Sequence, residues 1–183
     1  LEKINHDYII IRSTIPIVYC DKKNVFFMPE FLTEKNWEYD FINNKNLIYG
    51  IYDNCPEIKV NLFKNKISEL IDSALLNKKI KYNNIIYCST KEAELLKLIK
   101  NTFLSTKVSY FNEIYDLTKK LNINYDNVIE LVKTDDRIGN THMMCPGHDG
   151  KKGYGGTCFP KDTNSMYYQM IENNINTQLF EAN

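Results

Sequence analysis

Ten residues, Gly153–Asp162, bring together a glycine-rich stretch, a thiol and two charged groups. The three glycines allow backbone conformations that other residues avoid, and they let a ligand approach the main chain. Cys158 stands at the predicted start of a helix, where free backbone N–H groups and the helix dipole favour a thiolate. Lys161 adds positive charge, and Asp162 adds a carboxylate. A glycine-rich turn with a buried cysteine is the plainer interpretation, but this combination favours a nucleophilic site.

A second candidate pair lies on a predicted long helix. Lys97 and Asn101 are four residues apart, so they share one face of that helix. An ammonium beside a carboxamide suits the stabilisation of an oxyanion and the positioning of a hydroxyl. Taken alone, such a pair most often belongs to a solvated helix face.

Two further polar groups follow predicted strands. Ser13-Thr14 come after an apolar run at Tyr8–Arg12, and Pro29–Glu34 come after one at Asn24–Met28. In open parallel sheets, ligands bind at the carboxyl ends of the strands. Both placements favour a binding site, although neither decides it alone.

Metal binding is a weaker hypothesis. Cys145, His148 and Cys158 have a C-x2-H…C spacing that could begin a zinc site, but no fourth ligand stands out. We therefore predict no metal. His6 and His142 are interpreted as surface or packing residues.

The composition excludes several classes of protein. Lys plus Arg and Asp plus Glu each number 23, so the formal net charge is zero and nothing draws the chain to nucleic acid or to an anionic membrane. No apolar run approaches the roughly 20 residues of a membrane span, and residues 1–12 lack the pattern of a secretory signal. Five widely spread cysteines are an odd number. Reduced thiols and a cytoplasmic location are therefore expected.

The amino-terminal half has the pattern of an α/β sheet. Four short apolar runs are predicted to be strands buried on both faces: Tyr8–Arg12, Asn24–Met28, Leu47–Ile51 and Ile85–Cys88. Between the last two, a helix is predicted to begin near Pro56. Its apolar side is predicted to carry Ile58, Leu62, Ile67, Leu70, Ile71 and Leu75. A strand–helix–strand crossover of this kind indicates a doubly wound, parallel sheet.

After Cys88 the pattern becomes helical. Ser89–Glu92 is a capping box, and it predicts a helix of about thirty residues reaching roughly Leu121. The residues spaced for burial on this helix are Leu96, Ile99, Phe103 and Leu104. A shorter helix is predicted over 127–133, and helix again after Pro160. The chain therefore divides into an α/β part, 1–88, and an all-helical part, 89–183.

Five segments, in this order, resemble the UDP-glucose/GDP-mannose dehydrogenase family. They are STIP at 13–16, PEFLTE at 29–34 with Asp40 and LIYG at 47–50, the helix EAELLKLIKNTFLSTKVSYFNEI at 92–114, DDRIG at 135–139 and GYGGTCFPKD at 153–162. The resemblance covers nearly the whole chain. It implies that 1–88 is the C-terminal portion of a Rossmann-like NAD-binding domain with a parallel sheet, and that 89–183 is the central helical domain through which subunits dimerise.

The resemblance also implies a reaction. Members of the family use two NAD+ to oxidise the C6 alcohol of a nucleotide sugar to a carboxylate. Cys158 would attack the intermediate aldehyde, and the resulting thiohemiacetal would be oxidised to a thioester that water hydrolyses. By the same resemblance, Lys97 and Asn101 would stabilise the oxyanion. Three more residues would act on the hydrolytic water or the thioester: Asp162, Glu30 and Thr14.

Binding roles follow from the same motifs. The positions that resemble the sugar-binding residues are Glu30, Phe31, Leu32, Lys97, Asn101, Gly153, Tyr154 and Gly155. Arg137 resembles an arginine that reaches the substrate of the neighbouring subunit, which implies a homodimer. The positions near the cofactor are Ser13, Thr14, Glu34 and Lys161.

The chain departs from the family pattern in three ways. It contains no G-x-G-x-x-G after a strand, its Met144–Lys152 loop is longer, and the family's nucleotide-binding carboxyl-terminal domain is not recognised. A chain of this extent is expected to be a partial enzyme with weak or no NAD binding. The KD pair after CFP fits UDP-glucose or GDP-mannose better than UDP-N-acetylmannosamine, and UDP-glucose is favoured.

Two other functions stay open. A non-catalytic dimerisation module would keep the role of the central helices. An unrelated hydrolase with a cysteine nucleophile ranks last, because no histidine is placed persuasively beside Cys158.

Overall fold

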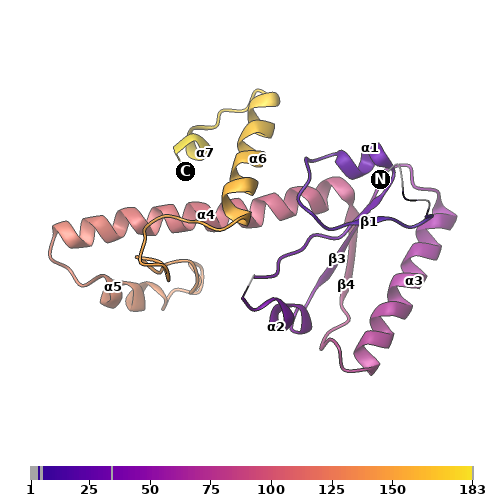
Figure 1. The fold of residues 1–183 in the computed structure, drawn as a ribbon, viewed down its shortest axis with the longest axis horizontal. Coiled ribbons are helices and arrows are strands. Elements are labelled where there is room, and N and C mark those ends of the chain that lie inside the picture. Colours follow the sequence, from indigo (N-terminus) through magenta and orange to yellow (C-terminus); the bar gives the residue numbers. More distant parts are fainter. Residues whose placement is uncertain (1–3, 5, 34, 183) are drawn as a thin grey trace. The chain divides into compact units, whose positions relative to one another are not determined.

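The computed structural model describes residue 4, residues 6–33 and residues 35–182 of the chain (Figure 1). The chain divides into two compact units, Leu1–Lys97 and Leu98–Asn183. The division falls inside the long helix α4 (Thr90–Lys120). The domain limits 1–88 and 89–183 stay a prediction, because compactness alone assigns no function to either part.

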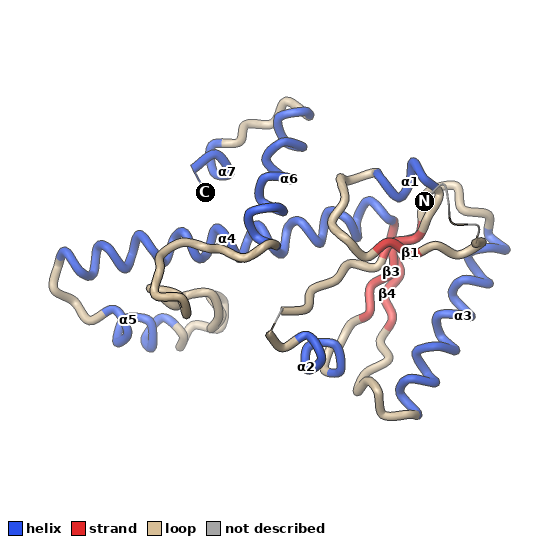
Figure 2. The backbone as a smooth tube through the Cα atoms, in the orientation of Figure 1, coloured by secondary structure: helices blue, strands red, loops and turns tan. Residues whose placement is uncertain are grey.

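The first unit contains a four-stranded sheet, whose strands are red in Figure 2. The strands follow one another in chain order. They are β1 (Ile10–Ile11), β2 (Phe26–Phe27), β3 (Leu47–Ile51) and β4 (Ile85–Ser89). β1 runs parallel to β2 and β3 runs parallel to β4, whereas β2 meets β3 antiparallel through one residue pair. The predicted α/β class is confirmed, and this antiparallel pair is the departure from a wholly parallel sheet. Two short helices that were not predicted follow β1 and β2: α1 (Tyr19–Lys23) and α2 (Trp37–Ile42).

Helix α3 (Glu57–Leu76) makes the predicted crossover from β3 to β4, and it begins directly after Pro56. Its buried side chains are Phe63, Ile67 and Ile71. The predicted apolar face was wrong for three residues, because Ile58, Leu62 and Leu70 are exposed. Phe63 takes the position facing the sheet by stacking on Phe26, with ring centroids 3.7 Å apart. The core around this pair also holds Leu47, Tyr49, Tyr52 and Ile80.

The start of α4 has the predicted capping box. The Ser89 hydroxyl accepts the N–H of Glu92 at 3.2 Å, and the Glu92 carboxylate accepts the N–H of Ser89 at 2.8 Å. Each side chain therefore satisfies a backbone donor of the other residue. The Glu92 carboxylate also accepts the Ser89 hydroxyl at 2.8 Å, and the backbone N–H of Ser89, followed by this hydroxyl, lowers the pKa of the Glu92 carboxyl.

Gly50 marks the place where β3 approaches the first turn of α4. A Cβ atom on Gly50 would lie 2.8 Å from the Cα atom of Thr90 and 3.2 Å from the Cβ atom of Ala93. Both of those residues are completely buried. The absence of a side chain at this position therefore sets how closely the helix can approach the strand.

The second unit is helical. It contains the part of α4 after Lys97 together with α5 (Tyr125–Val132), α6 (Cys158–Glu172) and α7 (Gln178–Ala182). Phe111 of α4 packs with Tyr125 and Ile129 of α5 and with Met143 and Cys145 of the following loop. The predicted burial on α4 was wrong for Ile99 and Phe103, which are exposed, while Leu96 and Leu104 are half-buried. Along the whole of α4 the buried positions are mostly polar: Thr90, Glu94, Lys97, Thr102, Ser105 and Thr118, beside Ala93, Leu98 and Phe111.

Within the described part of the chain, no helix is long and apolar enough to cross a membrane.

Replacing Gly50 with alanine is expected to lower the free energy of unfolding by about 1–3 kcal/mol, because the added methyl group meets backbone that cannot move aside. Urea unfolding followed by circular dichroism measures this. Gly155→Ala is the matched control, since open space surrounds that position. Equal stability of the two variants would contradict the close approach.

Candidate functional site

Cys158 is the first residue of α6, as the sequence predicts. Its side chain is exposed, and the hydroxyl of Thr157, the residue at the N-cap, lies 3.9 Å from its Sγ atom. The preceding segment turns sharply, with φ of 87° at Gly153 and 76° at Gly156, values that glycine tolerates best. The thiol is therefore presented to solvent at the amino-terminal end of α6.

Asp162 lies one helical turn after the thiol and is completely buried. Its Oδ2 atom accepts a hydrogen bond from Nδ2 of Asn101 at 2.6 Å. No described residue donates a hydrogen bond to its Oδ1 atom, and the Lys161 ammonium lies 3.8 Å from it. A buried oxygen of this kind calls for a ligand or water. Asn101 and Asp162, two of the predicted catalytic residues, are thus brought together.

Lys97 belongs to the first unit and is only 5 % exposed. Its Nζ atom donates to the backbone carbonyl of Glu30 at 2.7 Å and lies 6.0 Å from the centre of the Phe31 ring. The Glu30 carboxylate accepts the backbone N–H of Leu32. These four predicted site residues therefore lie together, and the alternative of a solvated helix face does not describe Lys97.

The predicted cofactor residues are only partly described. Ser13 is exposed and Thr14 half-buried in the loop that leaves the carboxyl end of β1, and Lys161 is exposed on α6. Glu34 lies outside the described residues. The hydroxyls after β1 suit the polar edge of a dinucleotide, but no G-x-G-x-x-G sequence is present to hold its pyrophosphate. These residues therefore fit only a part of NAD.

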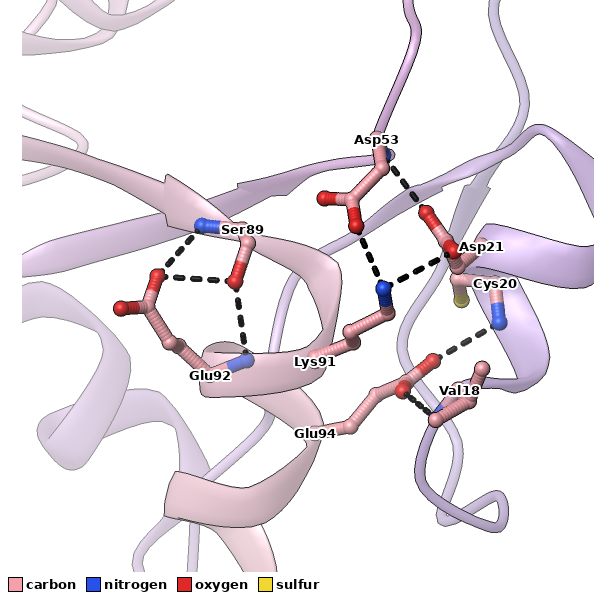
Figure 3. A network of polar contacts seen from close by, with 8 residues as sticks. All are labelled: Val18, Cys20, Asp21, Asp53, Ser89, Lys91, Glu92 and Glu94. Carbon is pink, nitrogen blue, oxygen red and sulfur yellow. Dashed lines mark hydrogen bonds and ion pairs between the residues drawn. The ribbon is translucent and has the colours of Figure 1, made fainter.

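The start of α4 is fixed to the rest of the first unit by two side chains, those of Glu94 and Lys91 (Figure 3). Glu94, 1 % exposed, accepts the backbone N–H groups of Val18 at 2.6 Å and Cys20 at 2.8 Å. Val18 has a φ of 74°, which is strained for a β-branched residue. Burial, and then the Glu94 carboxylate, raise the pKa of the Cys20 thiol.

Lys91 makes the second attachment. Its ammonium contacts the carboxylates of Asp53 and Asp21, the latter at 3.2 Å, and these partners raise its pKa in that order. The Asp21 carboxylate also accepts the backbone N–H of Asp53 at 2.6 Å. All of these groups are partly exposed, so the ion pairs add little stability and serve mainly to orient the turn.

Two aromatic side chains pack against Phe159, the residue that follows Cys158. Tyr154 packs edge-on against Phe159 with ring centroids 6.1 Å apart, and His142 packs against the same ring at 5.7 Å. Burial, followed by the charge of Lys107, lowers the pKa of His142. The imidazole also contacts the Thr141 hydroxyl at 2.9 Å. This arrangement agrees with the interpretation of His142 as a packing residue.

Arg137 is exposed and pairs with Asp135 of its own chain, with Nε 2.9 Å from Oδ1. This hydrogen bond lowers the pKa of the Asp135 carboxyl. Of the suggested metal ligands, Cys145 is buried and its thiol donates to Oδ1 of Asn112 at 3.2 Å. Among the described residues, no three His, Cys, Asp or Glu side chains gather closely enough to hold a metal ion.

Residues 91–183 match the sequence profile of the UDP-glucose/GDP-mannose dehydrogenase family, central domain. The chain belongs to this family. UDP-glucose 6-dehydrogenase of Campylobacter jejuni is 32% identical over 191 residues, and the match covers 99% of this chain and 44% of that protein. The enzyme of the same name from Streptococcus pneumoniae is 30% identical, with 96% and 44% covered. The chain thus spans less than half the length of these relatives.

Solved structures agree with this assignment. A UDP-glucose dehydrogenase from Pyrobaculum islandicum superposes with a TM-score of 0.73 at 26% identity, covering 94% of this chain and 39% of that one. A UDP-D-ManNAc dehydrogenase from Pyrococcus horikoshii has a TM-score of 0.69 at 24% identity, covering 94% and 40%. The second likeness supports the fold alone.

The sequence pattern did not predict a role for three polar residues on α4: Glu94, Ser105 and Asn112. Together with Lys97 and Asn101, the first two recur at 94, 97, 101 and 105, the spacing of one helix face. A buried helix face is usually apolar. Polar residues at the spacing of a buried face were therefore the sequence signal that could have identified these residues.

Glu94→Gln is expected to lower the free energy of unfolding by about 1–3 kcal/mol, because the amide nitrogen of glutamine would face a backbone N–H group that the carboxylate now accepts. Chemical denaturation measures the change. Glu92→Gln, in the exposed capping box of the same turn, is the matched control and is expected to cost under about 1 kcal/mol. A smaller effect at Glu94 than at Glu92 would refute the anchoring role.

Proposed function

We propose that this chain forms the central part of an NAD-dependent dehydrogenase that oxidises the C6 alcohol of a nucleotide sugar to a carboxylate. UDP-glucose is the favoured substrate, supported by the two relatives named UDP-glucose 6-dehydrogenase. Membership of the family supports the reaction class. The relatives are more than twice as long as the chain, so the activity is assigned to a protein that contains these residues.

One observation carries the proposal: an exposed thiol stands one helical turn before a buried aspartate that is held by an amide. Cys158 begins α6, and Asp162 accepts the Asn101 side chain on the next turn. A buried cysteine in a structural turn would be shielded from reagents, whereas this thiol is open to a substrate. Thiol, carboxylate and amide are the groups needed to form and cleave a thioester.

The alcohol, and later the covalent intermediate, would each lose one hydride to a separate NAD+, which Ser13, Thr14 and Lys161 would help to hold. Between these oxidations, the Cys158 thiolate would add to the aldehyde carbon, and the carbonyl oxygen would take a proton to give a thiohemiacetal. Loss of the second hydride and of the hydroxyl proton would leave a thioester on Cys158. Water would then cleave the carbon–sulfur bond, which releases the carboxylate and restores the thiol.

Lys97 and Asn101 would stabilise the oxyanion in these steps. Lys97 is held in place by the Glu30 carbonyl and keeps further N–H donors on its ammonium. Asn101 is oriented by Asp162, since one of its two N–H groups is committed to that carboxylate. Fixed donors of this kind are already aligned when charge develops on the substrate oxygen.

The hydrolytic step would draw on carboxylates. The Oδ1 atom of Asp162, which accepts no hydrogen bond from a described residue, would accept a proton from an incoming water. Glu30 and Thr14 would act on the same water, as the family resemblance implies. The sugar would be bound by the backbone of the segments that carry Phe31, Leu32, Gly153, Tyr154 and Gly155.

A homodimer is part of the proposal. Phe103, Tyr110 and Leu117 on α4 are seven residues apart, and their exposed fractions are 66 %, 59 % and 52 %. Seven-residue spacing places them along one seam, as in paired helices. An open groove of about 620 Å³ beside this seam is lined by α4, by α5 and by Arg137. Arg137 is the residue proposed to reach the partner's substrate. The same surface favours the second candidate function, a dimerisation module without activity.

Activity is tested in a chimaera in which this chain replaces the matching stretch of the Campylobacter jejuni enzyme. We expect two NADH per UDP-glucose consumed and no free aldehyde. Cys158→Ser is expected to reduce kcat by about a thousandfold, because the nucleophile is lost. Cys88→Ser, a half-buried cysteine on β4, is the control. One NADH per sugar with released aldehyde would contradict the thioester mechanism.

The dimer is tested by sedimentation velocity on the chain. Phe103→Asp combined with Tyr110→Asp is expected to convert dimers to monomers, because the substitutions place like charges on the apolar seam. Leu131→Asp, at an exposed position on α5, should leave the dimer intact. A dimer that survives the double substitution, or a wild-type chain that is monomeric at high concentration, would refute the pairing of these helices.

A further inference from the structure

The two ends of the Met144–Lys152 loop meet at one atom of α4. Oδ1 of Asn112 accepts the thiol hydrogen of Cys145 at 3.2 Å and the backbone N–H of Gly153 at 2.9 Å. Because both donors converge on one oxygen, the two ends of the loop are held side by side.

Between these ends, two backbone hydrogen bonds close the loop on itself. The N–H of Gly147 donates to the Lys151 carbonyl at 2.8 Å, and the N–H of Gly150 donates to the Gly147 carbonyl at 2.9 Å. The Lys152 ammonium reaches the carboxylate of Asp116 on α4 at 2.7 Å. The loop is therefore held closed by its own contacts, and the segment that follows it begins at a fixed position on α4.

The other end of the Cys158 segment is attached to the same helix. The Ser105 hydroxyl lies 3.0 Å from the Thr163 hydroxyl, and Asn101 donates to Asp162. At 100° per residue, Asn101, Ser105 and Asn112 lie within about 40° of one another around α4. One face of α4 thus holds the segment that carries Cys158 at both ends, at Gly153 before the thiol and at Asp162 and Thr163 after it.

The amide of Asn112 is itself oriented. Its Nδ2 atom donates to the carbonyl of Val108, one turn earlier on α4, at 2.6 Å, which turns Oδ1 toward the loop. The residue is half-buried, so water competes less well for that oxygen than on an open surface.

We propose that Asn112 is a positioning residue for Cys158. Its hydrogen bond fixes Gly153, the first glycine of the segment that leads to Cys158. The position of the thiol therefore does not depend on the length or sequence of the Met144–Lys152 loop. Asn112 does not touch Cys158; it acts through the backbone of Gly153. The inference rests on the proposed function only in taking Cys158 as the nucleophile.

The test is the rate of alkylation of each cysteine in the chain by iodoacetamide at neutral pH, read by mass spectrometry. Asn112→Ala is expected to slow the alkylation of Cys158 about three- to tenfold, because a segment that has lost this hydrogen bond holds the thiol less often at the start of α6. Hydrogen exchange at the Gly153 amide should accelerate by a similar factor. Cys20 and Cys88, in the first unit, serve as internal controls and should react as in the wild type.

Two further variants separate positioning from general loosening. Asn112→Asp keeps an accepting oxygen but loses the Nδ2 donor to the Val108 carbonyl, so the alkylation rate of Cys158 should lie between the rates in Asn112→Ala and in the wild type. Asp149→Ala removes the carboxylate that accepts the Lys151 N–H inside the loop and should leave Cys158 unchanged. The inference is overturned if Asn112→Ala leaves the Cys158 rate within twofold or raises it. It is also overturned if Asp149→Ala has the same effect as Asn112→Ala.

If Asn112→Ala fails to fold, Cys20 will react faster as well, and the comparison of Asn112→Asp with Asp149→Ala then decides. Alkylation does not depend on dehydrogenase activity. An unchanged alkylation pattern in an active chimaera would therefore sink this inference alone, whereas an inactive chimaera with the expected pattern would sink the proposed function alone.

Discussion

The buried carboxylate of Glu94 accepts two backbone N–H groups from the turn after β1, and this interaction fixes where α4 begins. Burying a charge is costly unless hydrogen bonds replace the lost water, so the helix has one favourable position against the strained turn at Val18. The close approach at Gly50 limits the same turn from the side of the sheet. Lys97 follows one turn later, and its place beside the Glu30 carbonyl is a consequence.

Further along α4, polar side chains continue to occupy the face that other segments cover. In the second unit, Asn101, Ser105 and Asn112 each hold a residue of the nucleophile segment or its immediate neighbour. An apolar face would bury more hydrophobic area, but it would fix neither a glycine-rich loop nor a carboxylate. Directional hydrogen bonds do both, because they hold only when donor and acceptor are aligned. The helix thus exchanges some packing for the positioning that chemistry needs.

The sequence predicts much of this arrangement where the signal is local. The limits of β3, the capping box at Ser89 and the start of α6 at Cys158 depend on neighbouring residues, and each prediction is confirmed. The buried faces of α3 and α4 depend on partners far along the chain. On α3, Phe63 faces the sheet because it stacks on Phe26, and this leaves Ile58 and Leu62 exposed. On α4, Thr102 and Ser105 are buried and Phe103 is exposed. The pairing of Asn112 with Gly153 crosses 41 positions and leaves no local pattern.

The central claim is that Cys158 carries the sugar as a thioester. Its most direct test is mass spectrometry of the acid-quenched chimaera during turnover with NAD+ and UDP-glucose, using Asp162→Asn to slow hydrolysis. The account predicts an acyl adduct with the mass of the oxidised nucleotide sugar on the peptide that contains Cys158, removable by hydroxylamine. An enzyme that forms NADH without any such adduct, or with the adduct on another cysteine, would contradict it.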